Sequence, residues 1–326
     1  PSSGAVIGDG AERGRPRPAA LDLEARFRHL AIDAPTGTGK TTLMANLVAH
    51  DLAQGYGIVA VDPKLDFANQ ILGLVPAHRV DQVTVIDPSD ETRPVGLNPL
   101  RPHGVSPELA VEHLVSIFHR IWSASWGVRS DDLWRAVLRT LIVDEDATLV
   151  DVGPMLTDTA FRRRLVRLVT DPVLVSYWRW FESLSDGEAA QVVGPVLNKW
   201  RALFGRPALR RILGQPHPTF DLTQAINNGG IVIVALNSGT IGEDAANLLA
   251  ALILGSVWNA VQARATQPAA LRHPLMLHLD EFPRYASLPV PFDEMLAQAR
   301  SYRVGITVAI QSLSQVPADL RNSLQV

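Results

Sequence analysis

Short apolar runs bounded by turn residues recur along the chain and predict buried parallel strands. There are six such runs, at His29–Asp33, Ile58–Asp62, Val83–Asp87, Ile231–Leu236, Leu275–Asp280 and Val304–Ile310. Helical patterns separate several of them, among them Thr41–Gln54, closed by Gly55, and the long pattern Asp244–Ala265. Strands that alternate with helices indicate an α/β fold with an open, doubly wound, mainly parallel sheet.

The pattern changes between about Val105 and Ala225, where helical segments such as PELAVEHLVSIFHRIW and DDLWRAVLRTLIVDE replace the strand-like runs. We therefore predict a loop-like N-terminal segment at 1–28, the first part of the core at 29–104, an all-α insertion at 105–225 and the second part of the core at 226–326. Six of the seven tryptophans lie in the helical stretch. They either fill the core of a helical bundle, which we favour, or form a stacking platform for single-stranded nucleic acid.

Composition and charge exclude several classes of protein. With 326 residues, of which 47% are hydrophobic and 19% charged, the chain is a folded protein. The absence of cysteine excludes disulfides and thiolate metal sites. The net charge of -3 means that any contact with nucleic acid needs a local patch. Arg162–Arg164 and Arg210–Arg211 are candidates, although charge runs usually form only a solvated face. The apolar run Ala245–Val261 contains asparagines and a glycine, which favours a buried helix over a membrane span.

The strongest chemical signal is APTGTGKTT at 34–42, which follows the apolar run HLAID and precedes the helical pattern TTLMANLVAH. A strand, a glycine-rich loop and a helix in this order are the context of a P-loop, in which backbone N–H groups hold phosphates. Lys40 would reach the β- and γ-phosphates, and the Thr41 hydroxyl would coordinate Mg²⁺. Ala34 stands where the usual pattern has glycine. The predicted nucleotide-binding residues are Pro35, Thr36, Gly37, Thr38, Gly39, Lys40, Thr41 and Thr42.

A second signal lies at the end of the run LMLHL, where Asp280 and Glu281 follow an apolar strand. Asp280 suits a Mg²⁺ ligand, and Glu281 a general base that activates the attacking water. Gln311 closes the last strand and is either a sensor of the γ-phosphate and the attacking water or a buried glutamine that binds the backbone. Arg300 is either an arginine finger that reaches a neighbouring subunit's nucleotide or an ordinary surface arginine. Lys64, after the second strand, is either a residue of the γ-phosphate side or of a DNA channel, or a partner in a surface salt bridge.

These motifs, in this order, resemble the HerA and FtsK branch of motor ATPases, and most of all the conjugative type IV secretion coupling proteins of the TraD and TraG kind. The resemblance spans nearly the whole chain from His29. It is carried by APTGTGKTTL, VDPKLDF, VTVIDPSDETRPVGLNPL, IVIVALNSGTIG, LHLDEFPR and QARSYRVGITVAIQSLSQV. It implies a RecA-like core with an inserted all-α domain, hexamers around a central channel and ATP-driven movement of DNA.

By position, the resemblance assigns Lys40 and Thr41 to the Walker A motif and Asp280 and Glu281 to the Walker B motif. Gln311 matches the sensor of the family and Arg300 its trans-acting arginine. One departure is Leu65, because relatives usually have glycine after the VDPK segment.

The expected function is that of an oligomeric, hexameric motor that hydrolyses ATP with Mg²⁺ and translocates DNA or a DNA–protein substrate, as in conjugative DNA transfer. The alternative is an ATP-dependent module that recruits a substrate without processive translocation. The expected partners are further copies of the chain, DNA, and secretion or relaxosome proteins bound through the helical insertion. We expect a cytoplasmic location, at the inner face of the cell membrane if an anchor lies outside this sequence.

Overall fold

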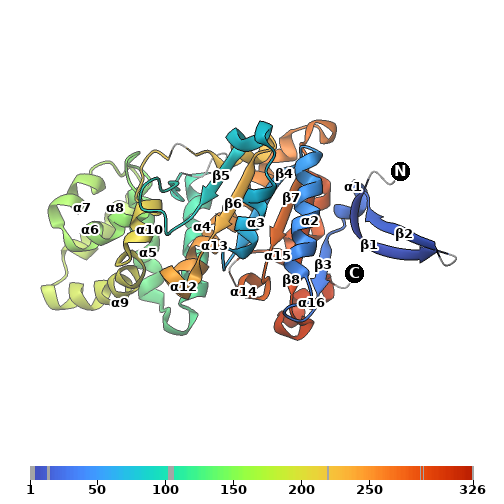
Figure 1. The fold of residues 1–326 in the computed structure, drawn as a ribbon. Helices are drawn as coiled ribbons and strands as arrows, with labels where there is room; N and C mark the ends of the chain where they lie inside the picture. Colours follow the sequence, from blue (N-terminus) through green and yellow to red (C-terminus); the bar gives the residue numbers. More distant parts are fainter. Residues whose placement is uncertain are drawn as a thin grey trace. The chain divides into compact units, whose positions relative to one another are not determined.

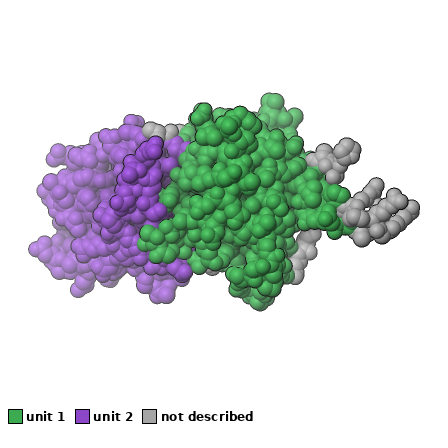
Figure 2. Space-filling view, in the orientation of Figure 1, with its two compact units in different colours: residues 1–87, 221–240, 253–326 green, residues 88–220, 241–252 purple. Residues whose placement is uncertain are grey.

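The computed structural model describes residues 4–12, 15–101, 106–218, 220–286, 288 and 290–324. The chain divides into two compact units, which Figure 2 shows in green and purple. Unit 1 comprises Pro1–Asp87, Asp221–Thr240 and Ile253–Val326, and unit 2 comprises Pro88–Phe220 and Ile241–Leu252. Unit 2 thus begins earlier than the predicted insertion. The reason is that the backbone N–H of Leu97 binds the Ile212 carbonyl at 2.9 Å and fastens this irregular segment to the helices of unit 2.

Unit 1 is built on a six-stranded parallel sheet with the strand order β3-β8-β7-β4-β6-β5 (Figure 1). Its strands are β3 Leu30–Asp33, β4 Gly57–Asp62, β5 Val83–Ile86, β6 Ile231–Ala235, β7 Leu275–Leu279 and β8 Val304–Ile310. The four central strands are buried along their whole length, which explains their predominantly apolar sequences. All six predicted strands are confirmed to within one residue, and the predicted α/β fold class is confirmed with them.

Helices α2 (Lys40–Ala53) and α3 (Asp66–Leu74) pack against one face of this sheet (Figure 1). Met44, Leu47 and Phe67 from these helices form one hydrophobic cluster with apolar residues of the strands. The other helices that lie in unit 1 or extend from it are α1 Leu23–Arg26, α11 Leu222–Asn227, α12 Ser238–Ile241, α13 Glu243–Gln262, α14 Pro283–Ala286, α15 Phe292–Gln298 and α16 Ala318–Leu324.

The helical stretch Glu243–Thr266 is the one stretch among the described residues that is long and apolar enough to cross a membrane. Its most apolar window has a mean hydropathy of 1.4, and 72% of that window is buried inside the structure. This burial agrees with the predicted core helix.

The N-terminal segment is not loop-like in its described part, so that prediction is wrong there. Strands β1 (Ala5–Glu12) and β2 (Arg15–Leu21) form an antiparallel hairpin, and β1 contacts α2. The proline and glycine content of this segment is typical of loops. A two-stranded ribbon, however, leaves each strand an unpaired edge at which proline is tolerated. Helix α1 (Leu23–Arg26) lies in the same predicted segment. Residues 1–3 and 13–14 of the segment lie outside the described residues.

Unit 2 consists of helices, with no strand among its described residues. Its helices are α4 Pro107–Ile121, α5 Val128–Leu141, α6 Val152–Thr157, α7 Thr159–Val166, α8 Pro172–Glu182, α9 Asp186–Phe204 and α10 Pro207–Leu213, together with the first part of α13. Helix α5 contacts α4, α6, α7, α8 and α9 and is the central element. Trp134 and Trp178 are buried, and the indole of Trp178 donates to the Thr140 hydroxyl at 2.7 Å, although Trp180 is exposed. The tryptophans therefore mainly fill the bundle core.

The first candidate basic patch of unit 2 is largely neutralised. Arg162 is buried. Arg163 forms an ion pair with Glu182 at 3.1 Å, and Arg164 with Asp144 at 3.0 Å. The run of arginines therefore contributes little free positive charge to this surface.

Candidate nucleotide site

The predicted phosphate-binding loop leaves the carboxyl end of β3 and enters α2. Gly37 and Gly39 have φ angles of 82° and 95°, and a Cβ at either position would meet open space. Glycine is therefore required here by the backbone conformation and not by lack of room. Ala34 does not have a positive φ, so alanine is tolerated where the usual pattern has glycine. Thr41, the predicted Mg²⁺ ligand, lies half-buried in the first turn of α2.

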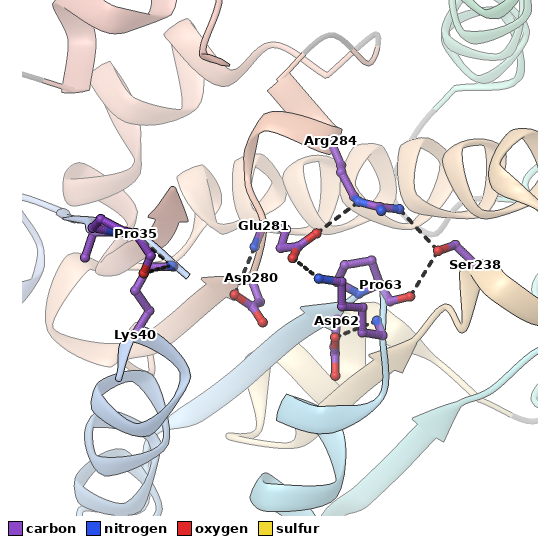
Figure 3. Close-up of polar contacts among 10 residues, drawn as sticks. Pro35, Lys40, Asp62, Pro63, Ser238, Asp280, Glu281 and Arg284 are labelled. Atoms are coloured by element: carbon purple, nitrogen blue, oxygen red, sulfur yellow. Dashed lines mark hydrogen bonds and ion pairs between the residues drawn. The ribbon is translucent and has the colours of Figure 1, made fainter. Parts of the chain in front are cut away.

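The ammonium group of Lys40 binds the loop itself. It donates hydrogen bonds to the carbonyl oxygens of Ala34 at 2.6 Å and Pro35 at 2.9 Å (Figure 3). The Thr38 hydroxyl also donates to the Pro35 carbonyl, at 2.7 Å. The N-cap Gly39 offers no side-chain acceptor, and the first turn of α2 carries no acidic residue. The amides at this helix end are therefore available to an anion.

The acidic pair lies at a sharp turn after β7. The N–H of Asp280 binds the Val61 carbonyl on β4 at 3.1 Å, whereas the N–H of Phe282 binds the Ala309 carbonyl on β8 at 2.9 Å. Glu281, between these two anchored amides, has a φ of 51°. This left-handed conformation is uncommon for a residue with a side chain, and such residues cluster at functional sites.

The P-loop and the acidic turn flank the same strand. The Ala34 N–H binds the carbonyl of Ile310 at 3.2 Å, and the Phe282 N–H binds that of Ala309, the preceding residue of β8. Gln311, which follows β8, therefore lies between the two motifs. The structure thus brings together the predicted residues on β3, β8 and β7, at the edge where ligands of open α/β sheets bind.

Asp62 joins this edge from β4, although the sequence analysis did not single it out. It is 1% exposed, and its carboxylate accepts hydrogen bonds from the backbone N–H groups of Lys64 at 2.8 Å and Ala68 at 2.9 Å. Asp280 is 8% exposed. Burial raises the pKa of the Asp280 carboxyl to about 6, with a further contribution from the negative charge of Asp62. Burial also raises the pKa of Asp62. The available signal for Asp62 in the sequence was its position at the end of an apolar strand.

Two neighbouring buried carboxylates fit a divalent cation, because a cation would relieve their mutual repulsion and Mg²⁺ prefers oxygen ligands. Thr41 and Asp280 are the predicted ligands. Among the described residues, no group of three or more His, Cys, Asp and Glu side chains could hold a metal ion. A Mg²⁺ site here would accordingly be completed by phosphate oxygens and water, as is usual for this ion.

Glu281 is held by two cations. One of its carboxylate oxygens forms an ion pair with the ammonium of Lys64, and the other accepts from Nε of Arg284 at 3.1 Å. Arg284 also donates to the hydroxyl of Ser238 at 3.2 Å (Figure 3). The Ser238 hydroxyl in turn donates to the carbonyl of Pro63 at 3.3 Å. Arg284 and Ser238 were missed in the sequence analysis, and the one available signal was the place of Arg284 three residues after Glu281.

Leu65 takes the conformation that relatives assign to glycine. It has a φ of 81° and is the N-cap of α3. The local backbone after the VDPK segment is therefore that of a glycine-containing turn, despite the substitution. Lys64 consequently points from this turn toward Glu281 and pairs with it.

Arg300 does not join the site of its own chain. It is exposed, lies in a 3-10 turn (Ala299–Tyr302) that precedes β8, and is 4.0 Å from the carboxylate of Glu24. The P-loop and Glu281 lie beyond the opposite, carboxyl end of the strands. The guanidinium of Arg300 therefore does not face the P-loop of its own chain.

Two family models match different parts of the chain. Residues 4–122 match the model described as the central domain of helicase HerA, and residues 182–319 match the model described as conjugative DNA transfer of the type IV secretory system. No curated protein matches the chain.

Several solved structures share the fold. The unbound bacterial conjugative coupling protein TrwBdeltaN70 matches with a TM-score of 0.63 and 19% identity, over 96% of this chain and 68% of that chain. The plasmid coupling protein TrwB in complex with ADP and Mg²⁺ has a TM-score of 0.65 and 19% identity, over 94% and 70%. VirB4 of Thermoanaerobacter pseudethanolicus has a TM-score of 0.65 and 15% identity, over 100% and 82%.

The two family matches do not overlap, and together they contain the P-loop, the acidic turn and all six strands of the parallel sheet. The shared fold of the coupling proteins and VirB4 covers the whole arrangement. The resemblance indicated by the motifs is therefore confirmed: two parts of the chain match the HerA central-domain and conjugative DNA transfer models, and the fold is that of the coupling protein TrwB and of VirB4.

Proposed function

We propose that this protein binds ATP with Mg²⁺ and hydrolyses its terminal phosphate bond. The observation that carries the proposal is the attachment of the P-loop and the acidic turn to consecutive carbonyls of β8, those of Ile310 and Ala309. Two motifs from distant parts of the sequence thereby face one edge of the sheet. The similar TrwB structures in complex with ADP and Mg²⁺ and with an ATP analogue support the choice of nucleotide and metal.

In this proposal each residue has a defined task. The amides of the loop and the Lys40 ammonium hold the β- and γ-phosphates, so Lys40 exchanges its loop carbonyls for phosphate oxygens. Thr41 and Asp280 hold Mg²⁺, which neutralises charge that develops on the phosphates. Glu281 takes a proton from the attacking water, and the Gln311 amide orients that water.

We extend the proposal to an oligomeric, hexameric motor that translocates DNA or a DNA–protein substrate. The match to the conjugative DNA transfer model supports the substrate, and the position of Arg300 supports the oligomer, since this residue lies away from its own P-loop. Secretion or relaxosome proteins would bind through the helices of unit 2. DNA would be held by several weakly basic copies acting together, which the net charge of one chain does not oppose.

The experiment is the ATPase rate of the purified protein with and without single- and double-stranded DNA. Lys40→Ala gives the background rate, and Lys40→Arg is its matched control, because arginine keeps the charge but not the compact ammonium. We expect stimulation by DNA in the wild type only. Turnover that does not respond to DNA would contradict the motor and favour a substrate-recruiting switch. An equal rate in Lys40→Ala would contradict the site itself.

A further inference from the structure

Glu281, the general base of the proposed reaction, is paired with two cations in this structure. Glu281 is 17% exposed, and cations from two directions bind both of its carboxylate oxygens. The two charge-assisted hydrogen bonds take up acceptor positions of this carboxylate and fix its orientation, so the departure of one cation opens a position for the attacking water. The two cations differ in how firmly they are placed.

Arg284 is the fixed partner. It follows Glu281 by three residues on α14, and its guanidinium bridges the carboxylate and the Ser238 hydroxyl. That hydroxyl and its own backbone N–H both donate to the Pro63 carbonyl, at 3.3 and 3.1 Å. Arg284 is thus held from two sides of the sheet edge.

Lys64 is the movable partner. Its side chain is 51% exposed, and Glu281 is the one hydrogen-bonding partner of its ammonium among the described residues. Its backbone, in contrast, is fixed, because its N–H binds the buried Asp62 carboxylate at 2.8 Å and Leu65 follows in a left-handed conformation. The flexible part of Lys64 is therefore the four-carbon side chain.

We propose that Lys64 is a positioning residue that holds Glu281 while the site lacks a triphosphate and moves to the γ-phosphate when ATP binds. The inference rests on the proposed ATPase function. The γ-phosphate carries more negative charge than a carboxylate, and the P-loop lies at the same sheet edge as Glu281. Transfer of the ammonium frees one oxygen of Glu281 for the water, whereas Arg284 keeps the carboxylate oriented.

The consequence is discrimination between ATP and ADP. ADP offers no γ-phosphate, so Lys64 stays on Glu281 in the ADP-bound protein. A bound triphosphate gains the contact with Lys64. Removal of the ammonium therefore weakens the binding of a triphosphate but not that of ADP. A surface salt bridge without this role would affect both nucleotides equally.

The test compares the affinities of the full chain for ADP and for a non-hydrolysable ATP analogue, with Mg²⁺, in the wild type and in Lys64→Met. We expect the variant to lose about tenfold in affinity for the analogue, the value of one charge-assisted contact, and to bind ADP as the wild type does. Lys64→Arg should recover part of the loss. An unchanged ratio of the two affinities in Lys64→Met would overturn the proposal.

The matched control is Arg284→Met, which removes the other cation from the same carboxylate. It should lower the maximal ATPase rate and leave the ratio of the two affinities unchanged. If it changed that ratio as much as Lys64→Met does, the effect would come from the placement of Glu281 and the proposed transfer would be wrong. If the wild type bound neither nucleotide, the ATPase proposal itself would fail, which is a separate outcome.

Discussion

Arg26 forms a buried, two-point ion pair with Asp51, which lies in the last turn of the P-loop helix α2. The guanidinium of Arg26 donates to both carboxylate oxygens of Asp51, at 3.1 and 3.0 Å. His278 on β7 makes a third contact, through Nε2 to Asp51 at 3.0 Å, and burial lowers the pKa of its imidazole. Since His278 lies two residues before Asp280, this cluster connects the short helix α1, the P-loop helix and the strand that carries the acidic pair.

We predict that Asp51→Ala will lower the free energy of unfolding by about 3–5 kcal/mol, because the substitution leaves the buried Arg26 charge without its partner. The measurement is urea denaturation of the full chain. The control is Glu182→Ala, which breaks the exposed pair with Arg163 in unit 2 and should cost less than about 1 kcal/mol. A double variant, Arg26→Met with Asp51→Leu, should recover most of the loss. Equal effects of the two single variants would contradict the assigned role.

The fold could be predicted from the sequence because the central strands are buried on both faces. Val304–Ile310 is buried throughout and apolar except for Thr307, and it was predicted with its observed bounds. The hairpin β1–β2 could not be predicted in this way, because residues 6–9 of β1 are exposed and the composition of the segment is that of a loop. The start of unit 2 at Pro88 depends on contacts with helices more than 100 residues away, such as that of Leu97 with Ile212.

In the candidate site, too, the residues of a local motif could be predicted, whereas contacts between distant residues could not. Lys40 and Thr41 belong to a local motif, so their position follows from nine consecutive residues. The ion pair of Lys64 with Glu281 joins residues 217 positions apart, and the sequence left a salt bridge open without naming the partner. Arg284 contacts Glu281 next to a backbone that is left-handed at Glu281. The sequence contains no pattern of residue types that predicts this conformation.

His29 should make stability depend on pH. Its Nδ1 accepts from the N–H of Ile306 at 3.1 Å, so its proton lies on Nε2, which donates to the Leu296 carbonyl at 2.9 Å. Burial lowers the pKa of this imidazole in the folded protein. A lowered folded pKa means that the contribution to stability is complete above the unfolded value of about 6.5 and is lost as the pH falls through the folded value.

The test is the free energy of unfolding of wild type and His29→Asn between pH 8 and pH 5. Asparagine tolerates the φ of 73° at this position and can present its side-chain oxygen near the place of Nδ1, but it does not titrate. We expect the variant to be less stable at pH 8 by about 1 kcal/mol, the value of the lost Leu296 hydrogen bond, and less sensitive to acid. Parallel pH curves for the two proteins would exclude His29 as a source of the acid sensitivity.

Glu281→Gln should separate binding from turnover. Glutamine keeps the size of the side chain but cannot take a proton from water, so we expect the ATPase rate to fall by about 10²–10⁴-fold. The affinity for ATP should not decrease, because no phosphate contact is removed and Lys64 is released from its ion pair. Equilibrium binding and steady-state turnover of the same preparation give both quantities. If the rate persisted, another group would have to act as the base.

Arg300→Ala should abolish turnover only if each active site combines the P-loop of one subunit with Arg300 of its neighbour. Arginine fingers contribute about 10³–10⁵-fold to the rate, and Arg300 lies on the amino-end side of β8, away from its own P-loop. In a ring with head-to-tail interfaces, an equal mixture of Arg300→Ala and Lys40→Ala subunits gives about a quarter of the interfaces an intact P-loop from one chain and an intact Arg300 from its neighbour. We therefore expect two inactive variants to regain measurable activity when they are assembled together.

Glu24→Ala, which removes the carboxylate beside Arg300 but leaves the arginine, should remain active. Mixed assemblies without activity, or full activity of Arg300→Ala alone, would show that this arginine does not act across the interface.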